Sequence, residues 1–375
     1  GGWALLNRGA ADASDSIAVL PFANLSADPA QAYFADGIAG EIRNTLTRIP
    51  GLKVAGSTSS DAVREDDAQT AARKLGVANI LAGNVRQTPS TIRVTAELID
   101  GATGLTKWSQ NYDRAPGDAI TIQTDIAADV ARALEVALSA SAKNALAAGE
   151  TSNIAAQTLV FQARNLSYQF TVPALQQSLQ LLEKAISLDP NYARAYAMKS
   201  FVANNLASQT ARTSAELATG RDQALDYAKV ALSIAPNLPI AHSALGYAHA
   251  LKLQARESLR EHEIALSLAS GDPDVIRNYG FAMSTIGKPE EALRHVDEAL
   301  ALDPLNSRSH SGHVSVLFYA RRYEEAVRYS LQLKQDSPEL FNFPVLLGHS
   351  LLMLGRTGEA ALAFGGNMTS EALLA

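Results

Sequence analysis

A period of 34 residues runs through the second half of the chain and constrains its fold more than any other feature. Small residues recur at this interval, and proline recurs at another position of the same unit. The repeated positions hold Ala224, Ser258, Ala292, Ala326 and Ala360; Ala231, Ala265, Ala299 and Leu333; Gly246, Gly280, Val314 and Gly348; and Pro236, Pro304 and Pro338. Because fixed periods of about 20 to 50 residues are typical of stacked arrays, we expect each unit to pack against its neighbours.

Two segments within this region carry a resemblance to a known repeat family. The stretches "GKPEEALRHVDEALALDP" and "ARRYEEAVRYSLQLKQDSP" resemble the second helix of tetratricopeptide repeats, and "LEKAISLDPNYARAYAM" resembles an earlier unit. The resemblance implies two antiparallel helices per unit, and residues 153 to 168 would supply the first helix of the earliest one. We therefore expect an all-α tetratricopeptide-repeat solenoid over residues 151–375, with about five repeats and a degenerate last one.

The period breaks once. Ala185 and Ala231 lie 46 residues apart instead of 34, and the additional residues fall between Asn204 and Arg221. This stretch is rich in serine, threonine and alanine, so we expect a longer loop there.

Residues 16–148 show a different pattern, which predicts an α/β domain with a mixed sheet. An apolar run at 16–20 precedes an amphipathic helix at 31–48, a second strand follows at 52–55, and a short helix from Asp67 ends at Gly76. Three alternating segments come next, and in the middle one Ile92, Val94, Ala96 and Leu98 share one face, as in a half-buried antiparallel strand. A long helix from Ile120 to about Leu146 completes the predicted domain.

This first domain resembles the TolB-like amino-terminal domain of bacterial signalling proteins. The resemblance covers nearly 130 residues and rests on "SIAVLPFANLSADPAQAYFADGIAGEI", "IPGLKVAGSTSS" and "AARKLGVANILAGNVRQTPSTIRVTAELIDGATGLTKWSQNYDR". In that family the domain is linked to tetratricopeptide repeats and preceded by a membrane span. Ahead of the span lies a winged-helix DNA-binding domain, as in CadC-type regulators, or an adenylate or guanylate cyclase domain. The resemblance implies no catalytic residue here.

The residue types needed for catalysis are scarce. The chain has no cysteine, its first histidine is His242, and it lacks a phosphate-binding Gly-Lys-Ser/Thr loop and a dinucleotide glycine motif. We interpret the cluster Ser57–Asp61 as helix-capping residues, and Asp36 and Glu41 as solvated charges, since their spacing puts them off one helix face. We therefore predict no enzyme activity, no cofactor and no bound metal.

Charge and hydropathy limit the partners of the chain. The net charge is −6 and neither half is basic, which argues against binding of nucleic acid. No apolar run approaches the roughly 18 residues that span a bilayer. We expect residues 1–15 to be a leader or linker that follows a membrane span. Residues 9–15 are small and polar, as in a linker, and Trp followed by Arg just after apolar residues is typical of the end of a membrane span. A cloning leader is the alternative.

The predicted binding surface is the inner face of the solenoid, which the first helices line. Projection of the period onto those helices places twelve side chains there: Phe201, Asn204, Asn205, Ser243, Tyr247, Arg277, Asn278, Phe281, Arg308, Ser315, Tyr319 and His349. Arg277, Asn278 and Arg308 fall where chaperone-binding members of the repeat family hold a terminal carboxylate. Phe281 and Ser315 stand where that clamp has asparagine. We therefore favour a plain solvated groove or a different ligand over a carboxylate clamp.

All seven histidines lie in the repeat region. His242 and His249 are seven residues apart and His310 and His313 are three apart, so either pair could bind a metal or titrate near neutral pH. The favoured interpretation is packing, because His242 and His310 occupy a repeat position usually taken by a bulky aromatic residue.

The sequence thus predicts a non-catalytic sensory region of a membrane-anchored bacterial signalling protein, on the periplasmic side of the inner membrane. It would bind a protein or peptide in the repeat groove and regulate a cytoplasmic effector outside this sequence. The alternative is a cytoplasmic adaptor that assembles protein complexes. Oligomeric state stays open, with a homodimer as one possibility.

Overall fold

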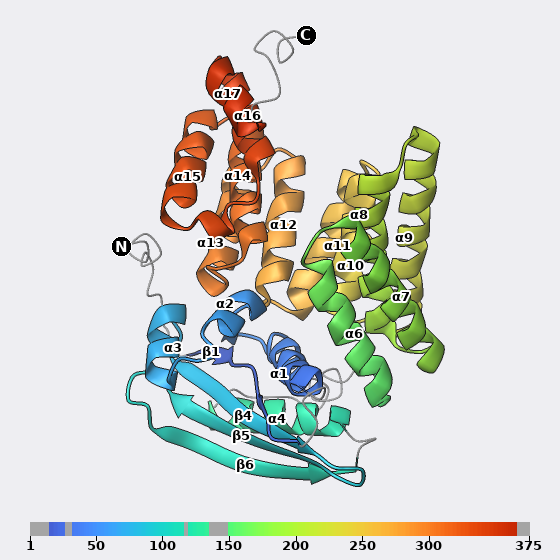
Figure 1. The fold of residues 1–375 in the computed structure, drawn as a ribbon, viewed down its shortest axis with the longest axis vertical. Helices are drawn as coiled ribbons and strands as arrows, with labels where there is room; N and C mark the ends of the chain where they lie inside the picture. The colour runs from blue at the N-terminus through green and yellow to red at the C-terminus, as the bar shows by residue number, and fades with distance from the viewer. Residues whose placement is uncertain (1–14, 27–31, 116–118, 135–148, 366–375) are drawn as a thin grey trace. The chain divides into compact units, whose positions relative to one another are not determined.

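The computed structural model describes residues 15–26, 32–115, 119–134 and 149–365 (Figure 1). They belong to two compact units, one of residues 12–275 and one that begins at Ile276. The predicted leader, except for Asp15, lies outside the described residues, and so do the last ten residues and the end of the helix predicted from Ile120.

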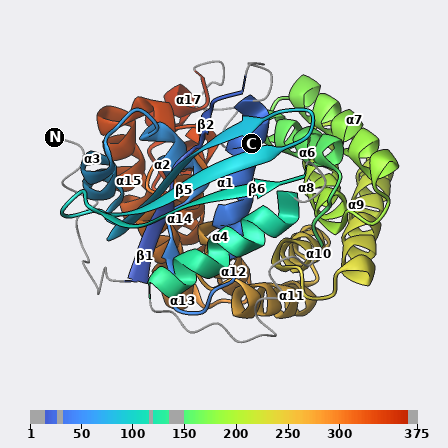
Figure 2. The same cartoon turned by 90° about the horizontal axis from the view of Figure 1, so that it is seen from below.

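The first unit begins with an α/β fold around a mixed sheet. Its strands are β1 (Ser16–Val19), β2 (Ala23–Asn24), β3 (Lys53–Val54), β4 (Asn79–Gln87), β5 (Ile92–Asp100) and β6 (Thr106–Arg114), and its helices are α1 (Ala32–Leu46), α2 (Ser57–Ala62), α3 (Ala68–Leu75) and α4 (Ala119–Ala133). The sheet order is β3-β1-β4-β5-β6, with β2 also paired to β4. Strand β1 pairs in parallel with β3 on one side and with β4 on the other, and β4, β5 and β6 form an antiparallel meander (Figure 2).

Helices cover the sheet on both faces because β1 is apolar on both sides. Ile17 and Val19 pack with α1 and α4, whereas Ala18 and Leu20 pack with α3. Since side chains alternate along a strand, one continuous apolar run supplies both cores.

The predicted alternation of β5 is confirmed. Its inward residues Ile92, Val94, Ala96 and Leu98 are fully buried. On the outer face, Arg93 pairs with Asp113 of β6 at 2.6 Å between Nε and Oδ1. The sheet therefore has one apolar and one polar face at this edge, as a half-buried antiparallel meander requires.

Two local predictions can be compared with the helix ends. Gly76 adopts φ 67° and ends α3, which confirms the predicted left-handed cap. The interpretation of Ser57–Asp61 as capping residues is wrong, because these residues lie inside α2 and Gly56 precedes the helix without a side-chain cap. Asp67 is the residue that caps a helix here, since its side chain accepts a hydrogen bond from the Thr70 amide.

From residue 154 to residue 363 the described chain is a succession of six helix pairs. They are α6 (Ile154–Ser167) with α7 (Val172–Leu188), α8 (Ala193–Thr210) with α9 (Ser214–Ile234), α10 (Pro239–Leu251) with α11 (Ala255–Leu268), α12 (Pro273–Thr285) with α13 (Pro289–Leu302), α14 (Ser307–Tyr319) with α15 (Tyr323–Asp336), and α16 (Pro344–Met353) with α17 (Thr357–Ala363). A short 3-10 helix, η5 (Pro338–Leu340), precedes α16. The predicted fold class, a mixed-sheet α/β domain followed by an all-α tetratricopeptide-repeat solenoid, is confirmed, with one more pair than the five or so repeats expected.

The small residues of the period lie where the two helices of a pair touch. A Cβ atom added to Gly246 would lie 2.8 Å from His262 of α11, and one added to Gly348 would lie 2.5 Å from the Phe364 ring. Ala265, Ala299 and Ala326 are fully buried. The period is thus a packing period, set by the closest approach of neighbouring helices.

The long loop predicted between Asn204 and Arg221 is wrong. Helix α8 continues to Thr210 and α9 starts at Ser214, so most of the inserted residues lengthen the two helices. The stretch contains no proline, and the Thr213 hydroxyl caps α9 by accepting a hydrogen bond from the Glu216 amide, which together allow helix where composition suggests loop.

The predicted boundary near residues 148–151 separates two kinds of secondary structure, whereas the compact units divide within α12. The first three helix pairs belong to the same unit as the sheet. The domain division at 16–148 and 151–375 stays a prediction.

Candidate functional site

Three of the predicted groove residues come together on the first helices of the 12–275 unit. The rings of Phe201 on α8 and Tyr247 on α10 lie 5.6 Å apart, and the Tyr247 hydroxyl donates to Asn205 Oδ1 at 3.1 Å. All three side chains are partly exposed. Helices α8 and α10 therefore share a small, partly exposed group of aromatic and amide side chains.

Asn204 does not share this accessibility. Its side chain was expected to face the groove, but the residue is fully buried, and neither amide atom has a hydrogen-bond partner among the described residues. Helix α8 continues past Asn204 to Thr210, so this residue lies inside the helix among its buried positions.

In the unit that begins at Ile276, the predicted polar residues are split between core and surface. Arg277 is only 6% exposed, which corrects the expectation of an open side chain, and its Nη2 donates to Asn278 Oδ1 at 3.1 Å. The Arg277 stem passes over Gly312 of α14, where an added Cβ would lie 3.5 Å from it. Arg308, in the first turn of α14, is exposed.

A chain of aromatic rings extends from these residues along the same unit. Phe281 of α12 and Tyr319 of α14 lie 6.2 Å apart, and Tyr319 is 5.9 Å from Phe318. Phe318 is 6.3 Å from His349 of α16, which is 5.5 Å from Phe364. Phe281, Tyr319 and His349 were predicted for the groove. Phe318 and Phe364 were missed, although Phe318 could have been found from its place beside Tyr319 in the sequence.

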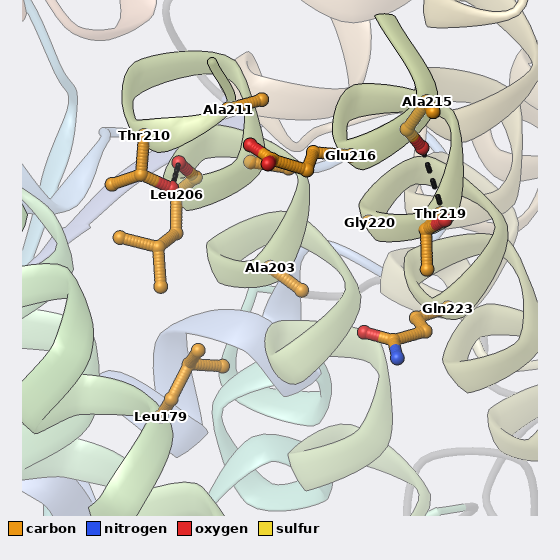
Figure 3. A pocket seen from close by; sticks show the side chains of 11 residues that line it. Leu179, Ala203, Leu206, Thr210, Ala211, Ala215, Glu216, Thr219, Gly220 and Gln223 are labelled. Atoms are coloured by element: carbon orange, nitrogen blue, oxygen red, sulfur yellow. Dashed lines mark hydrogen bonds between the residues drawn. The ribbon is translucent and has the colours of Figure 1, made fainter. Parts of the chain in front are cut away.

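The lengthened helix pair also forms a hollow of about 550 Å³ (Figure 3). Leu179, Ala203 and Leu206 line it from α7 and α8, and Glu216 and Gln223 line it from α9. The Glu216 carboxylate already has a partner within the chain, because its Oε2 accepts a hydrogen bond from the Arg212 amide at 2.8 Å. Thr210 and Thr219 donate to carbonyls of their own helices. Most of its polar side chains thus serve the helices and do not converge on the hollow.

The histidines support the packing interpretation. His242 and His310 are 8% and 3% exposed, and each has its Nε2 2.8 Å from a proline carbonyl, Pro236 and Pro304 respectively. Burial lowers the pKa of His310. His249 pairs instead with Gln254, so it does not join His242 on a common ligand. Among the described residues no group of three or more metal-ligating side chains comes together.

The most unusual electrostatic feature of the 12–275 unit is a buried cluster of four charged side chains. The Arg194 guanidinium lies at the start of α8, with Nε 2.9 Å from Glu150 Oε1 and Nη2 3.4 Å from Glu41 Oε2 of α1. Arg48 approaches Glu150 at 3.5 Å from the other side. The four side chains are 3–8% exposed. Glu41 was expected to be solvated, and that expectation is wrong.

Burial and charge act against each other within this charged cluster. Burial raises the pKa of Glu41, while the positive charge of Arg194 opposes this change. Burial also disfavours the charged form of Arg194, but Glu150 and Glu41 outweigh it and leave the Arg194 pKa above its ordinary value. Such pairs are costly to bury, and removing one member leaves a charge without compensation.

The charged cluster lies beside a close contact between α1 and α6. A Cβ atom on Gly37 would lie 1.8 Å from the Phe161 ring, and one on Gly40 would lie 3.0 Å from Arg164 Nη2. Farther along the chain, Gly271 donates its amide to the Thr47 carbonyl at 3.4 Å. The sheet domain thus contacts the interior of α6 and the segment that follows α11.

No helix in the described part of the chain is both long and apolar enough to cross a membrane.

Comparison with known proteins gives partial matches. The chain matches no protein-family model. It is 35% identical over 193 residues to "Putative adenylate cyclase 3" of Rhizobium meliloti (strain 1021), a match that covers 51% of the chain and 33% of that protein. It is 24% identical over 214 residues to the transcriptional regulator HilA of Salmonella paratyphi A (strain ATCC 9150 / SARB42), covering 57% of the chain and 38% of HilA. The matches therefore span only about a third of the length of these relatives.

Solved structures of repeat proteins are similar to the helical part. The thermophilic tetratricopeptide-repeat protein TTC0263 of Thermus thermophilus is 18% identical with a TM-score of 0.38, covering 54% of the chain and 91% of that protein. YrrB, described as a tetratricopeptide-repeat protein with an unusual peptide-binding site, is 18% identical with a TM-score of 0.34. This similarity covers 50% of the chain and 95% of YrrB.

Proposed function

We propose that the chain is a non-catalytic, protein-binding sensory region of a bacterial signalling protein. In this proposal the α/β part is a TolB-like domain, the repeats bind a protein or peptide segment, and the effector lies elsewhere in the same protein. The observation that carries the proposal is the meeting of predicted groove residues on first helices, Phe201 with Tyr247 and Phe281 with Tyr319. Aromatic side chains offer large contact area at low entropic cost, so they are common in binding surfaces.

The partial relatives support a regulatory role. One is named "Putative adenylate cyclase 3" and the other "Transcriptional regulator HilA", and these names give different outputs. The two matches cover 51% and 57% of the chain and therefore overlap within it. A segment shared by proteins with different outputs suits a sensor better than an effector.

The buried charged cluster offers a route for coupling. A ligand shifts a conformational equilibrium only if it prefers one of the two states. Because Glu41 belongs to α1 and Arg194 to α8, binding that moves α8 would disturb the contacts of both. The sheet domain would then respond to an event in the repeats.

A selection experiment tests the binding proposal. A random library of 12-residue peptides would be displayed against the 375-residue chain, and dissociation constants of selected peptides measured by fluorescence anisotropy. Tyr247→Ala or Tyr319→Ala should weaken binding at least about tenfold, which corresponds to about 1.4 kcal/mol. Tyr168→Ala, which alters an exposed tyrosine after α6, is the matched control. An absence of binders, or an equal loss with Tyr168→Ala, would contradict the proposal.

A separate measurement tests the location. We propose that the chain lies on the periplasmic side of the inner membrane, joined to a membrane span ahead of residue 1. The coding sequence upstream of residue 1 should then encode an apolar segment of about 20 residues, preceded by a winged-helix or cyclase domain. A start codon immediately before Gly1 would favour the cytoplasmic adaptor instead.

A further inference from the structure

We draw no further inference here: the strongest candidate, the exposed apolar surface patch of Tyr319, Val345 and Met353 on the first helices α14 and α16, carries none, because nothing in the structure shows what covers it.

Discussion

Arg194 compensates two buried carboxylates at once, so its loss should affect stability more than the loss of a surface charge. Replacing it in Arg194→Met would leave Glu41 and Glu150 buried without the one side chain that contacts both of them. We expect the free energy of unfolding to fall by about 3–5 kcal/mol, the range for breaking a buried ion pair. Urea unfolding followed by circular dichroism measures this change.

Lys229→Met provides the control. Lys229 pairs with Asp226 at 3.6 Å, and both side chains are more than half exposed. Such a pair contributes about 0–1 kcal/mol. If both variants lose the same small amount, the charged cluster does not stabilise the unit.

His262 should make stability depend on pH. Burial lowers its pKa to about 4, from an ordinary value of 6.5. Below pH 6.5 His262 binds a proton in the unfolded chain but stays neutral in the folded chain until the pH approaches 4. The free energy of unfolding therefore falls as the pH drops from 6.5 towards 4. We expect a loss of about 2.5 kcal/mol between pH 7 and pH 4.5 from this residue.

The comparison of the protein with its His262→Gln variant isolates that contribution. Urea unfolding at both pH values should show a smaller loss for the variant, because glutamine does not titrate. If both proteins lose the same stability between pH 7 and pH 4.5, the folded state does not lower the pKa of His262.

At this scale the sequence predicts side-chain environment only where the cause is local. The burial of Ile92 and Val94 follows from strand alternation and was predicted correctly. Glu41 was misjudged because helix spacing says nothing about Arg194, a partner that lies 153 positions away in the sequence. Buried charges of this kind depend on tertiary contacts that no local pattern contains.

Helix α1 approaches α6 so closely that a methyl group added to Gly37 should push the two helices apart. In Gly37→Ala the added Cβ would overlap the Phe161 ring at 1.8 Å. Alanine favours helix over glycine by about 1 kcal/mol, so any net destabilisation must come from the overlap. We expect a loss of about 1–3 kcal/mol in thermal or urea unfolding.

Gly358→Ala in α17 is the matched control, since an added Cβ there meets nothing within 4 Å. It should leave stability unchanged or slightly increased. The double variant Gly37→Ala with Phe161→Ala should lose less than the sum of the single variants. Strict additivity would show that Gly37 and Phe161 do not interact.

Among the helices, repetition was the reliable signal and composition was not. The period predicts the contacts of Gly246 and Gly348, because in each repeat the same position lies against the second helix of the pair. The stretch after Asn204 occurs once, so no other repeat constrains it. Its serine and threonine content suggested a loop, yet capping by Thr213 and contacts between α8 and α9 favour helix.

For the 12–275 unit as a whole, we expect the sheet domain and the first helix pairs to lose protection together. Hydrogen exchange of Arg194→Met should be faster in α1 and α8 alike, with the opening free energy lowered by about 3–5 kcal/mol in both. Faster exchange confined to α8 would show that the sheet domain is stable independently of the repeats.

At the level of the whole chain, the sequence predicts the fold class but not the grouping of its parts. The change from strand periodicity to the repeat period marks residues 148–151, whereas the compact units divide within α12. The difference arises because Glu150, Phe161 and Arg194 contact the sheet domain, and these contacts are invisible in a periodic pattern.

The glycine face of α1 has a consequence for protein engineering and for evolution by gene fusion. Gly37 and Gly40 leave room for the side chains of Phe161 and Arg164, which belong to α6. The sheet domain therefore cannot be transferred to another protein as a segment that ends at α4. A chimera that joins it to an unrelated repeat protein would have to retain α6 and the beginning of α8. Recombination breakpoints that preserve function should therefore fall inside the array, beyond Arg194.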